Sequence, residues 1–141
     1  MIEKAFIDTN LFVYVYLDGE KEKHKIVSQL LRKMLVDSDV FISTQVLHEF
    51  YAALMKYKRT HEDVVGFIDE IVQAANVRSV SLSTVEQALH LKGKYGFSYW
   101  DSLILASALE CGCAILFTES LQHNQIIEGT LRIRNPFVNV D

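Results

Sequence analysis

The sequence predicts a three-layer α/β domain, in which a mainly parallel sheet of four to five strands carries helices on both faces. Short apolar runs alternate along the chain with longer segments whose apolar residues recur at helical spacing. Strands separated by helices in this way form parallel sheets. The chain has 141 residues, of which 50% are hydrophobic, and this suits one domain with its own core. We therefore expect a single domain over residues 1–141.

The predicted strands are short apolar runs bounded by polar residues. Residues 113–118 form the clearest of them, and Gly112 is placed to end the helix before this run. Residues 131–134 alternate between apolar and basic side chains, so we expect an edge strand there. The other expected strands cover residues 5–7, 40–43 and 77–82.

The predicted helices carry apolar residues three and four positions apart. Two of them begin at pairs with capping-box spacing, Thr60 with Asp63 and Ser83 with Glu86. The expected helices cover residues 24–35, 44–57, 61–75, 83–94 and 99–110.

Neither a targeting segment nor a membrane segment is expected. The N-terminus lacks the basic flank, apolar run and cleavage site of a signal peptide, and no apolar stretch approaches the length of a bilayer span. Cys111 and Cys113 lie too close in sequence to staple a fold, and no Cys or His pair accompanies them at zinc spacing. These features indicate a cytoplasmic protein with reduced thiols.

The net charge of −4 argues against a protein that grips nucleic acid by bulk charge alone. It is compatible with a nuclease, because carboxylates that bind metal lower the net charge and a bound cation reverses the local field. Basic residues occur in clusters that suit either a solvated face or a phosphate track. The clusters are Lys21, Lys23 and Lys25; Lys56, Lys58 and Arg59; Lys92 and Lys94; and Arg132 and Arg134.

Asp8 is the sharpest functional signal. In open parallel sheets, ligands bind beyond the carboxyl ends of the strands. Asp8, Thr9 and Asn10 follow the first predicted strand, and Thr118 begins a second polar group at the end of the fourth. A carboxylate between two apolar segments must be paired or bind a cation, unless it caps the next helix. Position alone leaves both readings open.

Glu49 and Asp101 are the two further candidate acids. Glu49 lies at the margin of an apolar stripe, where a solvated side chain is the alternative, but its helix opens onto the same sheet edge as Asp8. The strongest competing role for Asp101 is capping, because Ser98 precedes it at capping-box spacing. A nearly continuous apolar helix follows Trp100, so we expect the start of that helix to point into a cleft.

Three carboxylates form a ligand set for a hard cation, Mg²⁺ or Mn²⁺. Such metal ions orient a scissile phosphate, lower the pKa of a bound water and stabilise charge on the leaving oxygen. The implied reaction is hydrolysis of a phosphodiester bond, which requires neither a histidine pair nor a serine nucleophile.

The order and spacing of these motifs resemble the PIN-domain family, in particular the VapC-type ribonuclease toxins of prokaryotic toxin–antitoxin pairs. The resemblance runs over nearly the full chain and implies a PIN-like three-layer sandwich. It is carried by residues 6–10, Glu49, residues 99–101 and residues 116–120, and residues 121–123 and 135–137 are similar to one branch of the family.

The resemblance implies that Asp8, Glu49 and Asp101 are the catalytic residues and hold Mg²⁺ or Mn²⁺, directly or through water. It also implies three supporting roles. Thr9 and Thr118 would hold the ligands by hydrogen bonds, and Asn10 would orient the first loop.

A fourth acid usually stands in this family where the present chain has Ser120. Glu119 or Ser120 would add a metal contact through water, although neighbouring side chains diverge where a strand exits into a loop. Without the fourth carboxylate we expect low metal affinity or reduced activity.

The resemblance also implies partners: an RNA substrate, a cognate antitoxin that covers the acidic cleft, and a second copy of the chain in a homodimer. Four aromatic residues would serve such an interface or stack on unpaired bases, with ordinary core packing as the alternative. The candidates are Tyr14, Tyr16, Tyr51 and Trp100.

Three alternatives stay open. A degenerate PIN domain would bind RNA or a protein without cleavage, and Ser120 motivates this reading. A phosphatase-like fold with an aspartate nucleophile needs a second acid where the chain has Asn10. A two-histidine ribonuclease needs a pair among residues that show no shared placement, namely His24, His48, His61, His90 and His123.

Overall fold

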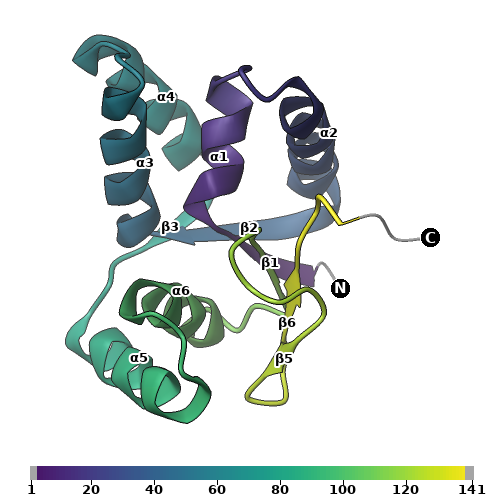
Figure 1. The fold of residues 1–141 in the computed structure, drawn as a ribbon, viewed down its shortest axis with the longest axis vertical. Helices are drawn as coiled ribbons and strands as arrows, with labels where there is room; N and C mark the ends of the chain where they lie inside the picture. The colour runs from purple at the N-terminus through teal and green to yellow at the C-terminus, as the bar shows by residue number, and fades with distance from the viewer. Residues whose placement is uncertain (1–2, 139–141) are drawn as a thin grey trace.

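The computed structural model describes residues 3–138 of the chain (Figure 1). Within that range there are six strands and six helices. In chain order they are β1 (Glu3–Ile7), α1 (Thr9–Tyr16), α2 (Lys21–Asp37), β2 (Ser38–Ser43), α3 (Thr44–Lys56), α4 (His61–Ala74), β3 (Asn76–Arg78), α5 (Leu82–Tyr95), α6 (Tyr99–Glu110), β4 (Ile115–Phe117), β5 (Ile126–Ile127) and β6 (Leu131–Arg134).

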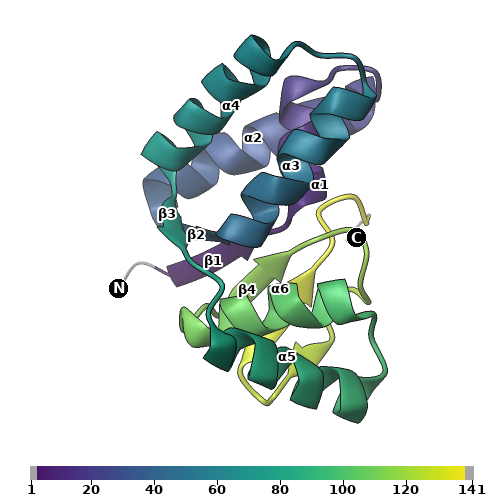
Figure 2. The same ribbon diagram turned by 90° about the vertical axis from the view of Figure 1, so that its left-hand side faces the viewer.

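The six strands form one sheet in the order β3-β2-β1-β4-β6-β5. Neighbouring strands are parallel except for β5 and β6, which are antiparallel. Helices α1 to α4 lie on one face of the sheet and α5 and α6 on the other (Figures 1 and 2). The predicted α/β class is confirmed. The described sheet has six strands rather than four to five, because the two residues of β5 pair with β6.

Strand β6 does not lie at the edge of the sheet, which corrects the expectation for residues 131–134. It pairs with β4 on one side and with β5 on the other. Leu131 and Ile133 are fully buried whereas Arg132 is exposed. The alternation in sequence therefore reflects one buried face of the strand rather than an open edge.

Strands β1 and β4 and helix α6 contribute fully buried side chains to the core. Phe6, Ile7 and Leu116 are fully buried in the two central strands. Helix α6 is buried from Ser102 to Ala108, because it packs against α5 on one side and the sheet on the other. This confirms the expectation that the helix is deeply buried. No helix within residues 3–138 is both long and apolar enough to span a membrane.

The N-cap of helix α5 lies two residues before the predicted one. Ser81 is the N-cap and Thr84 completes the capping box, so the predicted pair of Ser83 and Glu86 is wrong. The Thr84 hydroxyl is 3.1 Å from the Ser81 nitrogen and also donates to Glu110 at the end of α6, at 3.0 Å. The Thr84 hydroxyl fits this position because it can accept the Ser81 N–H and donate to Glu110 at once, which links α5 to α6.

The strand order reverses between β1 and β4. From β1 the chain runs outward through β2 to β3, and it returns through α5 and α6 to β4 on the other side of β1. Open α/β sheets bind ligands at such a switch point, beyond the carboxyl ends of the strands. The polar groups that begin at Asp8 and Thr118 both lie there, and the Asp8 amide donates to the Phe117 carbonyl at 3.0 Å.

Candidate active site

Asp8 is buried at the end of β1, with 6% of its surface exposed. Its backbone is the N-cap of α1, and its Oδ1 accepts the Thr9 N–H at 2.7 Å. Its Oδ2 accepts the Thr118 hydroxyl at 2.8 Å. The capping reading of Asp8 is therefore correct, and it leaves the carboxylate at the edge of a pocket.

The buried position of Asp8 disfavours the charged form of its carboxyl group. Burial raises the pKa of Asp8 to about 6, against the opposing hydrogen bonds from Thr118 and Thr9. The nearby charges of Glu49 and Asp101 raise the pKa further. Asp8 thus lies close enough to both acids to be affected by their charges.

Glu49 reaches the same place from α3. Its Oε1 accepts the Thr9 hydroxyl at 2.9 Å, and its Oε2 accepts the Gln45 side-chain amide at 3.2 Å. Since Gln45 also donates to the Trp100 carbonyl at 3.1 Å, it joins α3 to the first turn of α6.

Asp101 is in that first turn of α6. The Ser98 side chain accepts the Asp101 N–H at 3.1 Å, which is the capping role expected from spacing. The Asp101 carboxylate is free of this cap and accepts the Ser120 hydroxyl at 3.4 Å. Asp101 therefore combines a capped backbone with a side chain directed at the switch point.

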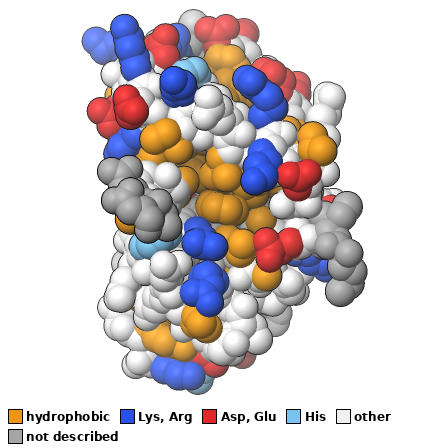
Figure 3. Space-filling view, turned by 90° about the vertical axis from the view of Figure 1, so that its right-hand side faces the viewer, with side chains coloured by type: hydrophobic (Ala, Val, Ile, Leu, Met, Phe, Trp, Pro, Cys, Tyr) orange, Lys and Arg blue, Asp and Glu red, His pale blue; other side chains and the backbone are white. Residues whose placement is uncertain are grey.

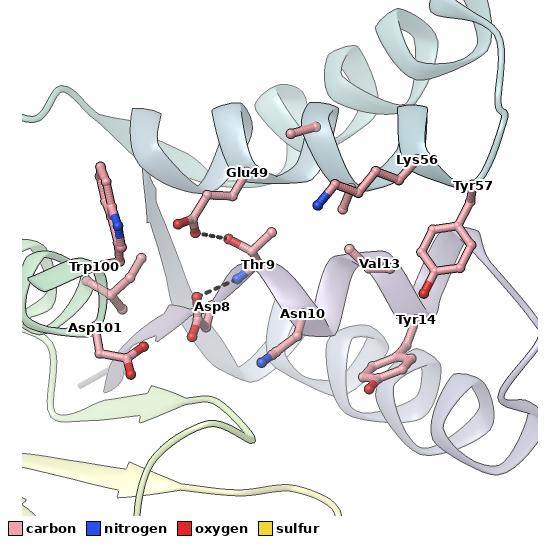
Figure 4. Close-up of a pocket in the computed structure, with 13 residues that line it drawn as sticks. Asp8, Thr9, Asn10, Val13, Tyr14, Glu49, Lys56, Tyr57, Trp100 and Asp101 are labelled. Atoms are coloured by element: carbon pink, nitrogen blue, oxygen red, sulfur yellow. Dashed lines mark hydrogen bonds between the residues drawn. The ribbon is translucent and has the colours of Figure 1, made fainter. Parts of the chain in front are cut away.

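The three acids line one pocket of about 590 Å³. Figure 4 shows the carboxylates of Asp8, Glu49 and Asp101 directed into the same end of it. Within residues 3–138, none of the three takes part in a salt bridge. The pocket thus gathers acids from β1, α3 and α6 without pairing any of them in a salt bridge.

Each of the three carboxylates accepts a hydrogen bond from one hydroxyl group. The Thr9 and Thr118 side chains therefore lie beside the candidate ligands, where the resemblance places supporting residues. The donor and acceptor pairs are Thr118 and Asp8, Thr9 and Glu49, and Ser120 and Asp101.

Ser120 extends this arrangement into a short chain of hydroxyls. Its Oγ is 3.0 Å from the Thr118 Oγ1, and its N–H donates to that oxygen at 3.2 Å. A hydroxyl has one proton, and Thr118 gives its proton to Asp8. The Ser120 proton is therefore shared between Thr118 and Asp101.

Glu119 is turned away from the three acids. Its carboxylate accepts hydrogen bonds from Tyr14 and from the Lys23 ammonium, the latter at 2.9 Å, and it is not among the residues that line the pocket. The Lys23 ammonium also lies over the Phe137 ring, 5.1 Å from its centre. Of the two residues considered for the missing acid, Ser120 faces Asp101 and Glu119 does not.

The donor set fits a hard cation in its chemistry, because every candidate ligand is an oxygen. The amide oxygen of Asn10, which is in the first turn of α1 rather than in a loop, is buried without a hydrogen-bond partner. As the side chains lie, no group of three or more His, Cys, Asp or Glu residues within 3–138 is close enough to hold an ion. A closed ligand set would therefore require side-chain rotation.

Three residues of this region are not predicted from the sequence to belong to the site. Gln45 is one, and its signal is the spacing of four residues to Glu49 on a helix. Lys56 and Tyr57 line the opposite end of the pocket. Lys56 follows Glu49 by seven residues, and this spacing places both on one face of α3.

The PIN domain family model matches residues 5–123. The matched segment includes Asp8, Glu49 and Asp101 as well as Ser120. No curated protein sequence matches this chain.

Solved structures of toxin–antitoxin proteins share the fold. A toxin–antitoxin complex from Klebsiella pneumoniae superposes with a TM-score of 0.70 and 20% identity, over 94% of this chain and 98% of that one. DNA-bound VapBC from Salmonella typhimurium gives 0.69 and 15%, over 96% and 99%. A VapC toxin from Mycobacterium tuberculosis that cleaves the sarcin-ricin loop gives 0.63 and 19%, over 79% and 86%. At these identities the likeness concerns the fold.

Proposed function

This chain belongs to the PIN domain family, and from that membership we propose that it is a metal-dependent endoribonuclease, the toxin of a VapBC-like pair. One observation carries the proposal. Asp8, Glu49 and Asp101 share a single pocket, and no residue between 3 and 138 forms a salt bridge with them. Gathering unpaired carboxylates is costly unless they serve a cation.

The chain contributes the oxygen ligands and the groups that orient them. Asp8, Glu49 and Asp101 would hold Mg²⁺ or Mn²⁺, while their three hydroxyl partners limit how far each carboxylate can turn. When bound, the ion supplies the charge that orients the scissile phosphate and stabilises the leaving oxygen. Asp8 is buried at the carboxyl end of β1, which would hold this ligand in place. Helices α3 and α6 bring Glu49 and Asp101 to the same pocket.

The substrate and partners follow from what the structural neighbours are. We infer an RNA substrate, since one neighbour cleaves the sarcin-ricin loop. We infer an antitoxin partner, since other neighbours are toxin–antitoxin complexes. A homodimer and a cytoplasmic location complete the proposal.

A matched pair of variants tests the metal role of Asp101. Asp63 stands in α4 as Asp101 stands in α6, because a hydroxyl three residues earlier accepts its N–H at the same distance of 3.1 Å. Asp63 is exposed and does not line the pocket. Asp101→Asn should lower Mn²⁺-dependent cleavage of a mixed RNA pool by about 100-fold or more, whereas Asp63→Asn should leave it unchanged.

The same assay distinguishes the alternatives. Cleavage that persists in excess chelator would contradict the metal-dependent mechanism. RNA binding without cleavage, from folded protein free of antitoxin, would favour the non-cleaving PIN domain. Ser120 motivates this second function, because the family usually has a carboxylate at this position and a hydroxyl is a weaker metal ligand.

A further inference from the structure

The acidic pocket also holds a cation, Lys56, and adjoins a second hollow that carries charges of both signs. Trp100 stands at one end of the pocket, and Lys56 and Tyr57 line the other end, with the three acids between them and nearer to Trp100 (Figure 4). A second hollow adjoins that end and shares Val13, Tyr14 and Tyr57 with the pocket. Arg59 lines it, as do the acids Asp18 and Glu20. The two adjoining hollows are together called the path; the three candidate acids line only its first part.

The cations on this path are unpaired. Lys56 and Arg59 are exposed, and the salt bridges within residues 3–138 involve only Lys23 and Lys94 as cations. Elsewhere the charges are mixed, and on the face in Figure 3 basic and acidic side chains surround an apolar patch. Since the chain carries a net charge of −4, attraction for a polyanion must come from a few placed cations rather than from the whole surface.

The aromatic residues on the path are exposed to an unusual degree. Trp100 is 61% exposed and Tyr57 is 65% exposed. The Trp100 ring also forms part of a further hollow with Gln45, His48 and Leu103, so it is the wall between two cavities. Its backbone carbonyl is held by Gln45 at 3.1 Å, which fixes the ring's point of attachment beside Asp101. Large exposed rings beside a polar site are suited to stacking on planar ligands.

Lys56 lies further along α3 than the acid Glu49. It follows Glu49 by seven residues, or about 10 Å along the helix at 1.5 Å per residue. A phosphate held at Lys56 would therefore belong to a nucleotide near the one at the acids, rather than to the scissile phosphate itself.

We propose that this path binds unpaired RNA on both sides of the scissile phosphate, with Trp100 and Tyr57 stacking on bases at opposite ends and Lys56 and Arg59 contacting backbone phosphates. The proposal rests on the proposed ribonuclease function and adds the substrate's form and the residues that position it. Bases within a duplex already stack on one another, so they are not free to stack on the Trp100 and Tyr57 rings. A single strand offers both its bases and its phosphates.

The single tryptophan of the chain makes the stacking directly measurable. Trp100 is the only tryptophan, so a change in intrinsic fluorescence reports on this position alone. The titration uses Asp8→Asn protein, which cannot cleave under the proposed mechanism, with an oligouridine of about eight nucleotides. We expect saturable quenching by this strand and much weaker quenching by the same length of duplex or by an oligomer without bases.

Two sets of variants separate stacking from phosphate contact. Binding by the Trp100 variants is followed by the anisotropy of a labelled oligouridine, because they contain no tryptophan. Trp100→Ala should weaken binding roughly tenfold to hundredfold, with Trp100→Phe restoring most of it. Lys56→Ala with Arg59→Ala should reduce the slope of log affinity against log salt by about 1.4, because each phosphate contact contributes about 0.7 in single strands. The composition-matched control, Arg32→Ala with Lys33→Ala on α2, should leave the slope unchanged.

Failure of this proposal is distinguishable from failure of the ribonuclease. If wild-type protein cleaves RNA and the Trp100 and Lys56 variants bind and cleave as it does, the path is not the substrate track, although the nuclease stands. If RNA leaves the fluorescence unchanged and a peptide partner quenches it instead, the path is a protein site. If the protein neither binds nor cleaves RNA, both proposals are wrong.

Discussion

Asp8→Asn should stabilise the metal-free protein at neutral pH, although it removes a candidate catalytic residue. Burial raises the pKa of Asp8 from 3.8 to about 6. Between these two values the folded state keeps a proton that the unfolded state has lost. Stability therefore falls as the pH rises through this window, and the loss is complete above it. Asparagine has nearly the same shape and carries no charge, so the variant escapes this loss.

The magnitude follows from the pKa values. A difference of about two pKa units at 1.36 kcal/mol per unit gives an upper limit of about 3 kcal/mol at pH 7. In the variant, the new side-chain amide oxygen would still accept the Thr9 N–H, and the new amide nitrogen would donate to the Thr118 hydroxyl in place of accepting from it. Allowing for imperfect hydrogen bonds, we expect about 1 to 3 kcal/mol at pH 7 and little difference at pH 4.

Urea unfolding in chelator, at pH 4 and at pH 7, measures this difference. The matched control is Asp69→Asn at an exposed acid on α4, where no buried charge is removed. Added Mn²⁺ should then stabilise wild type more than Asp8→Asn, because a ligand that binds only the folded state raises its stability. The reasoning is refuted if Asp8→Asn is less stable than wild type at pH 7, or if its advantage is the same at both pH values.

Three further outcomes are expected. Ser120→Asp should tighten Mn²⁺ binding about tenfold in calorimetry, because it adds a carboxylate facing Asp101; unchanged affinity would show that this position does not reach the ion. Leu105→Ala should cost about 2 to 5 kcal/mol in thermal unfolding, since this side chain is fully buried in α6, and a loss below about 1 kcal/mol would contradict the packing. Iodoacetamide at pH 7.5 should modify Cys111 well before Cys113, as mass spectrometry of the peptides would show. The hydrogen bond between them lowers the pKa of Cys111 to about 7, whereas that same bond and burial raise the pKa of Cys113.

Elements that have chemical markers at their ends are predictable from the sequence. Helix α6 is predicted over residues 99–110, and the structure gives Tyr99–Glu110. Ser98 caps its start, and Gly112, in the left-handed conformation with φ of 71°, follows its end. Both markers act locally, so no tertiary information is needed to read them.

Elements defined by distant partners are not predictable in the same way. Helix α1 has almost no polar positions after Asn10, so its apolar run suits a buried strand as well as a helix. Strand β5 has only two residues and exists because β6 lies beside it. No periodic pattern can reveal an element of that length.

The candidate site is likewise predictable from the sequence only where local position decides the outcome. Asp8 follows a predicted strand, Glu49 lies on the helix after the next strand, and Asp101 lies at a helix start. These positions predict that the three acids share one edge of the sheet, and they line one pocket. The direction of Glu119 depends on Tyr14 and Lys23, which come from α1 and α2 and pair with it only in the fold. The metal-binding role of the three acids remains a prediction.

Mn²⁺ titration followed in the same samples by electron paramagnetic resonance and by RNA cleavage tests the central claim most directly. We predict that cleavage rises in proportion to bound Mn²⁺, with one midpoint for both signals, and that Glu49→Gln shifts both midpoints to higher Mn²⁺ concentration together. Cleavage at its full rate before any Mn²⁺ binds, or a Glu49→Gln variant with unchanged midpoints, would contradict the assignment of these carboxylates as the metal site of a ribonuclease.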